Sequence, residues 1–111
     1  MTKEEFMEKE RSMKKLIKEH NDIVLSYSRC KGELPTINLD TEDKIEKLAT
    51  GVLSIVKELN TVEAISLLKE EKKAEYIRAF DVVEKQCNYS LETVKKSRDF
   101  MKMWNRGKGR H

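Results

Sequence analysis

The chain has 111 residues, enough for one domain with one hydrophobic core, and charged residues make up 39% of it while apolar residues make up 38%. This composition favours long helices with narrow apolar stripes over a large globular core. The sequence has no run of about 18 apolar residues, and its N-terminus lacks the apolar centre of a signal peptide, so we expect no membrane span and a cytoplasmic location.

The first predicted helix covers residues 2–31. Thr2 and Glu5 have the spacing of a capping box, in which the threonine hydroxyl accepts from a backbone N–H of the first turn. Apolar residues then recur at heptad spacing, which is typical of a helix with one buried seam. Gly32 and Pro35 end the helix, and about thirty residues make a rod of about 45 Å.

The middle of the chain predicts a loop over 32–39 and a second helix over 40–59. The second helix repeats apolar residues at the i, i+3, i+4 spacing, and its single Gly51 indicates a close approach of another helix. A third helix is predicted over 61–87. The charged run 69–73 leaves open whether it is one helix or two.

The last predicted helix covers 90–105. Asn88, Tyr89 and Ser90 favour a break before it, because Asn tolerates left-handed backbone angles and Ser is a good N-cap. Residues 106–111 form a glycine-containing basic tail that we expect to be mobile. The sequence therefore predicts an all-α fold, a single small helical domain over 1–111. It would contain four helices, or five if 61–87 is divided, mostly antiparallel and connected by short loops.

Positive charge is concentrated at the C-terminal end. Residues 90–111 contain seven Lys or Arg and two acidic residues, a net charge of +5, whereas the whole chain carries +3, so residues 1–89 sum to −2. Such segregation is typical of contact with a polyanion. The first hypothesis is therefore a small regulatory protein that binds DNA or RNA, with phosphates held by Lys95, Lys96, Arg98, Lys102, Arg106, Lys108 and Arg110 and a base edge contacted by Thr93.

A helix-turn-helix is one form that this binding could take. The string Asn-Tyr-Ser-Leu-Glu-Thr-Val, starting at Asn88, resembles the turn and recognition helix of many bacterial regulators. Glu84 stands where that motif prefers a small residue, and Ser97 stands where it prefers an aliphatic one. The alternative is two packed helices of a bundle separated by a tight turn.

The second hypothesis is a protein–protein interaction module, an adaptor or inhibitor, with the basic tail incidental. The first predicted helix is long enough to extend beyond shorter neighbours and leave apolar residues uncovered. We expect it to form a homodimer or to dock on a larger protein. The predicted interface residues are Met13, Leu16, His20, Ile23 and Tyr27.

Catalytic motifs are not found in the sequence. His20 lies in the apolar seam of the first predicted helix without the neighbouring ligands of a metal site, and His111 ends the tail. Cys30 and Cys87 fall at apolar-facing positions, where we expect two buried free thiols. The sequence therefore predicts no enzyme activity, no metal and no cofactor.

Overall fold

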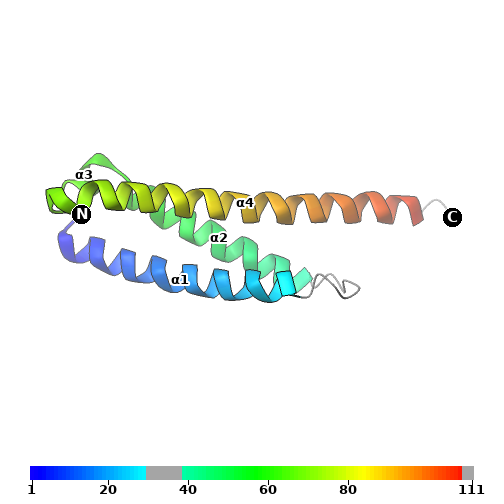
Figure 1. The fold of residues 1–111 in the computed structure, drawn as a ribbon. Coiled ribbons are helices and arrows are strands. Elements are labelled where there is room, and N and C mark those ends of the chain that lie inside the picture. Colours follow the sequence, from blue (N-terminus) through cyan, green and yellow to red (C-terminus); the bar gives the residue numbers. More distant parts are fainter. Residues whose placement is uncertain (30–38, 109–111) are drawn as a thin grey trace.

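The computed structural model describes residues 1–29 and 39–108, and all four of its helices lie in those ranges (Figure 1). They are α1 (Lys3–Arg29), α2 (Leu39–Leu59), α3 (Val62–Ile65) and α4 (Glu70–Lys108). The described residues contain no strand, so the predicted all-α class is confirmed. The molecule is elongated, with a longest dimension of 62 Å.

Helices α1 and α2 start and end close to their predicted bounds. The hydroxyl of Thr2 accepts from the backbone N–H of Glu5 at 3.2 Å, which confirms the predicted cap of α1. The two helices run antiparallel, and an ion pair of 2.6 Å between Lys9 and Glu58 joins the start of one to the end of the other. Apolar residues from α1 and α2 supply most of the core, together with side chains of α3 and α4; the buried members are Phe6, Met13, Ile45, Ala49, Val52, Val56, Leu59, Ala64, Leu68, Phe80, Cys87 and Val94.

The predicted helix over 61–87 is divided near its start. Thr61 caps the one-turn helix α3, accepting from the N–H of Ala64 at 3.1 Å. The chain then turns tightly through residues 66–69, and the buried side chain of Leu68 anchors this turn in the core. Helix α4 begins inside the charged run, with Glu70 and Glu71 in its first turn, where acidic side chains complement the helix dipole.

The break predicted at residues 88–90 does not exist, because α4 continues through them. Ser90 is buried, and its hydroxyl bonds to His20 of α1 at 2.9 Å instead of capping a new helix. The hydroxyl of Thr93 donates to the carbonyl oxygen of Tyr89 at 2.9 Å, a contact made within an unbroken helix. Both interpretations of this stretch, a helix-turn-helix and two packed helices separated by a tight turn, are therefore wrong. Residues 106–108, predicted as mobile tail, belong to α4, and residues 109–111 lie outside the described part.

Helix α2 packs against both of the other long helices, α1 and α4. Helices α1 and α4 run in the same direction, so they are not antiparallel to each other, and α2 runs opposite to both (Figure 1). Close backbone packing joins α2 to α1 and α2 to α4, whereas α1 and α4 meet mainly through long side chains. This arrangement resembles a four-helix bundle that lacks one helix, with α1 and α4 as its diagonal pair.

Two layers of side chains cross that diagonal. The hydroxyl of Tyr76 donates to the carboxylate of Glu10 at 2.9 Å, and the ring of Tyr76 lies 5.9 Å from Phe6 and 6.0 Å from Phe80. Burial and the bond to Glu10 raise the pKa of Tyr76. Farther along, the His20 and Ser90 pair makes the second layer. Buried polar groups thus fix how α4 is aligned with α1.

No described helix combines the length and the apolar character that crossing a membrane requires.

Gly51 lies where α2 packs against α1. A Cβ atom at this position would stand 3.4 Å from Cδ1 of Leu16, an ordinary van der Waals contact. Because glycine in a helix interior costs about 1 kcal/mol relative to alanine, Gly51→Ala should raise the free energy of unfolding by about 0.5–1 kcal/mol. Gly51→Leu should lower it, since the larger side chain cannot fit against Leu16. Urea unfolding followed by circular dichroism measures both, and a loss of stability in the alanine variant would contradict the described packing.

Candidate interaction surface on helix α4

Helix α4 carries a row of buried and half-buried side chains at alternating spacings of three and four residues. We call it the inner row; it consists of Lys73, Tyr76, Phe80, Val83, Cys87, Ser90, Val94 and Ser97. Residues at this spacing share one face of a helix, and this face is directed at α1 and α2. The row crosses the predicted break, which explains why α4 continues there: the same face remains buried on both sides of Ser90.

A second row with the same spacing lies on the neighbouring face of α4 and is exposed throughout. We call it the outer row; it consists of Ala79, Val82, Gln86, Tyr89, Thr93, Lys96, Phe100 and Met103. Its large apolar members are strongly exposed, with Val82 at 49%, Tyr89 at 72%, Phe100 at 63% and Met103 at 72%. Scattered apolar residues are normal on a protein surface, but a row at heptad spacing is typical of a helix-pairing seam.

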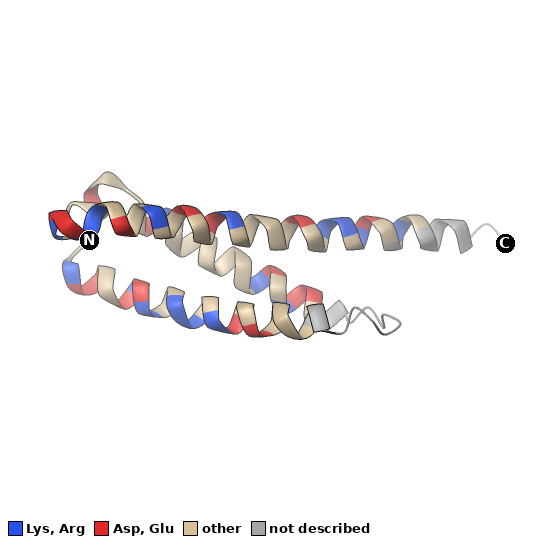
Figure 2. Ribbon diagram, in the orientation of Figure 1, with Lys and Arg blue, Asp and Glu red and all other residues tan. Residues whose placement is uncertain are grey.

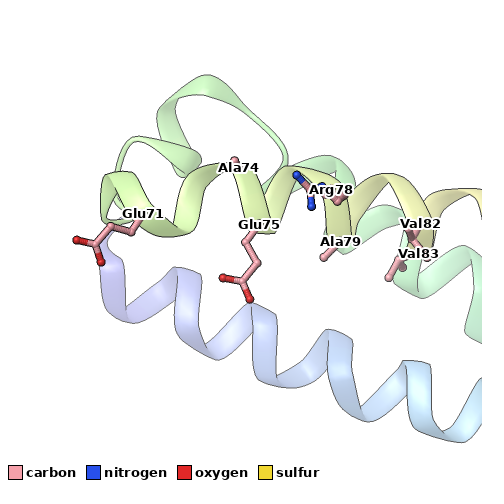
Figure 3. A pocket seen from close by; sticks show the side chains of 7 residues that line it. All are labelled: Glu71, Ala74, Glu75, Arg78, Ala79, Val82 and Val83. Atoms are coloured by element: carbon pink, nitrogen blue, oxygen red, sulfur yellow. The ribbon is translucent and has the colours of Figure 1, made fainter.

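The outer row faces the unoccupied corner of the bundle. Glu84, Asn88 and Arg98 lie on the other flank of α4, where they adjoin α2. Beside the outer row, α4 has instead a shallow hollow of about 600 Å³, lined by Glu71, Ala74, Glu75, Arg78, Ala79, Val82 and Val83 (Figure 3). Figure 3 shows Glu75 and Ala79 projecting from α4 toward the α1 side. One flank of α4 is thus covered by α2, and the other is open.

The far end of α4 extends past the rest of the bundle (Figure 1). Ser97 donates to the carboxylate of Glu42, close to the start of α2, at 2.6 Å. The turns of α4 after Phe100 therefore lie beyond the first turn of α2. Phe100 and Met103 lie about one and two turns beyond Ser97, and both are strongly exposed.

The predicted phosphate-binding residues are divided between two sides of α4. Figure 2 shows Lys and Arg alternating with Asp and Glu along the described part of α4. Lys95, Arg98 and Lys102 follow one another at spacings of three and four residues and share one side of the helix, whereas Lys96 and Thr93 lie in the outer row. Lys96 pairs with Glu92 at 3.2 Å. The side chains of Arg106 and Lys108 are outside the described part, as is Arg110.

Arg98 is held by α2. Its guanidinium pairs with both Asp43 and Glu46, in the first turns of α2, and is about one-third exposed. Glu42 lies next to these residues and is buried. Acidic side chains of α2 thus neutralise part of the charge that the sequence assigns to the basic end, and Arg98 fastens α4 to α2.

The predicted interface on α1 is largely turned inward. Met13 and His20 are 6% and 4% exposed, because they face the core and the diagonal contact with α4. Leu16 and Ile23 are half-buried, with Leu16 against Gly51, and the side chain of Tyr27 lies outside the described part. Little of this face is free to meet a partner. The three-and-four spacing of the outer row is visible in the sequence, but the predicted interface was placed on the first helix instead.

The groups with chemical reactivity are engaged in the fold. Cys87 is a buried free thiol, and burial raises its pKa, so it is a poor nucleophile; Cys30 lies outside the described part. His20 bonds to Ser90 and Asn21. Within residues 1–29 and 39–108, no three His, Cys, Asp or Glu side chains gather as metal ligands.

Arg98→Gln should lower the free energy of unfolding by about 1 kcal/mol, because it breaks a partly exposed two-carboxylate network between α2 and α4. Lys102→Gln removes the same charge from an exposed position and should change stability by less than about 0.5 kcal/mol. Thermal unfolding of the two variants makes the comparison. Equal effects would mean that Arg98 does not join the helices.

The chain matches no known protein family, no curated protein and no solved structure. What it does must therefore be inferred from its own geometry. The feature that stands out is the exposed outer row of α4 at the open corner of the bundle.

Proposed function

We propose that this protein is a non-enzymatic interaction module that binds an amphipathic helix of a protein partner along the outer row of α4. The observation that supports the proposal is the row itself, four large exposed apolar side chains at heptad spacing on the uncovered flank of a bundle helix. A helix laid along this flank would occupy the fourth corner. The partner would dock on α4, whereas the sequence pointed to α1.

Burial of this row can supply substantial binding free energy. Covering a large apolar side chain contributes about 1.5–3 kcal/mol, and Val82, Tyr89, Phe100 and Met103 are all available. Association also costs translational and side-chain entropy, so only part of that sum appears as affinity. A rigid helix reduces the loss of side-chain entropy, because the outer row is already aligned before the partner binds.

The polar members of the row limit which helix can bind. Gln86, Thr93 and Lys96 alternate with the apolar residues, so a uniformly apolar helix would bury the Gln86 amide and the charge of Lys96 at a cost. A suitable partner helix has an apolar seam interrupted by polar residues, and charged residues at its borders. This is the chemistry of a helix-in-groove or coiled-coil partner.

Site-specific photocrosslinking in cells that make the protein naturally tests the proposal. A benzoylphenylalanine at position 89 or 100 should form adducts, because both positions lie in the outer row. The same group at Ser54, an exposed position of α2, serves as the control and should form none. Adding Val82→Asp should remove the adduct from position 89, since a charge in the seam blocks helix pairing. Adducts at all positions alike, or at none, would contradict the proposal.

Nucleic-acid binding is a second candidate, and the segregation of charge supports it. Residues 90–111 carry +5, and Lys95 and Lys102 are exposed on the same side of α4. The basic segment would hold phosphates without base readout, because the recognition helix of a helix-turn-helix does not form.

Affinity for single-stranded and duplex DNA at two salt concentrations tests this candidate. Binding through the basic segment should weaken steeply with salt, with a slope of about −0.9 for each duplex phosphate neutralised. The double variant Lys95→Gln, Lys102→Gln should bind more weakly than Lys44→Gln, Lys47→Gln, which removes two exposed lysines of α2. Equal binding by the two double variants, or no binding at low salt, would exclude it.

A further inference from the structure

A contact with α2 interrupts the side of α4 that carries Lys95, Arg98 and Lys102. We call this side the basic side. Both lysines are exposed, and they lie about 10 Å apart along the helix axis. Arg98 lies between them, and its guanidinium pairs with Asp43 and Glu46 of α2. A phosphate backbone laid along the two lysines would therefore pass over this contact.

The contact is open to solvent, so an incoming anion can reach it. The side chains of Asp43 and Glu46 are 62% and 45% exposed, and that of Arg98 is 33% exposed. Water screens ion pairs with this exposure, which makes them weak. A guanidinium binds phosphate oxygens and carboxylate oxygens with the same pair of parallel hydrogen bonds. Arg98 can therefore exchange its carboxylate partners for a phosphate.

Until that exchange takes place, the contact opposes a polyanion. Asp43 and Glu46 carry two negative charges against the single positive charge of Arg98, so the contact has a net charge of −1 in the middle of the basic side. The two carboxylates also occupy the donors of Arg98 that a phosphate would use. The start of α2 thus competes with a nucleic acid for the same side chain.

We infer that the contact of Arg98 with Asp43 and Glu46 is autoinhibitory, and that a nucleic-acid backbone displaces these two carboxylates when it binds the basic side. This inference rests on the proposed nucleic-acid function and names a regulation of the same site. An isolated phosphate engages too few cations to displace two carboxylates. A nucleic-acid strand is held by Lys95 and Lys102 as well, and its next phosphate then competes locally for Arg98.

The salt dependence of DNA binding tests the inference. A fluorescein-labelled duplex is titrated with the wild-type chain and with the released variant, Asp43→Asn with Glu46→Gln, at several salt concentrations. Each duplex phosphate neutralised contributes about −0.9 to the slope of log K against log salt. In the released variant Arg98 is available before binding. The slope should therefore be steeper by up to about 0.9, and the affinity at low salt should rise about fivefold.

Two controls separate the release of Arg98 from the loss of negative charge. Adding Arg98→Gln to the released variant should restore the slope of Arg98→Gln alone, because no guanidinium is then set free. Glu4→Gln with Glu8→Gln removes two exposed carboxylates from the other end of the molecule. It changes the net charge equally and should keep the wild-type slope. Circular dichroism checks that every variant is folded at the temperature of the titration.

The outcomes distinguish this inference from the nucleic-acid function on which it rests. Wild-type binding with an unchanged slope and affinity in the released variant overturns the autoinhibition alone. A gain that persists in full when Arg98 is replaced also overturns it, since the gain is then due to net charge. If no variant binds at low salt, the nucleic-acid function and the autoinhibition are both wrong. Binding by the released variant that exceeds wild-type binding only when Arg98 is present supports the inference.

Discussion

The diagonal contact between α1 and α4 is the constraint on which the rest of the structure depends. Glu10 with Tyr76, and His20 with Ser90, are polar pairs in a mostly apolar interior. Sliding α4 by one turn would leave each of them unpaired, and an unpaired buried polar group costs about 1–3 kcal/mol. The pairs therefore fix the position of α4 along α1. Because they span the diagonal of the bundle, they also hold the two backbones apart and leave one flank of α4 uncovered.

The length of α4 follows from the same constraint. Local signals at Asn88 and Ser90 favour a turn, but their cost inside a helix is only some tenths of a kcal/mol each. The inner row stays buried across them, and Ser90 gains a buried partner in His20. Tertiary packing thus outweighs local preference. Sequence periodicity was sufficient to predict α1 and α2, whose apolar stripes are bounded by strong stop signals, and insufficient for α4, whose interior contains weak ones.

The candidate site could be predicted only in part, because some of its residues contact residues that are far away in the sequence. Arg98 meets Asp43 and Glu46 across more than fifty residues, and no pattern in the sequence shows that these charges pair. Likewise, the three-and-four spacing from Val82 to Met103 is visible in the sequence. Which of the two rows of α4 is covered by the other helices, however, depends on the fold. The sequence therefore reveals the presence of charge and of apolar rows, while their availability to a partner is a tertiary property.

The two rows of α4 divide its sequence between folding and association. Inner-row residues are buried or half-buried in the single chain, so changing them alters stability. Outer-row residues such as Tyr89 and Phe100 are largely exposed, as they are in an unfolded chain, so folding gains little from them. A charge introduced in the outer row should therefore weaken association without unfolding the bundle. Stability and association are separable because the inner row contacts the rest of the bundle, whereas the outer row is exposed. Substitutions in the outer row can therefore alter which partner binds while the fold is retained.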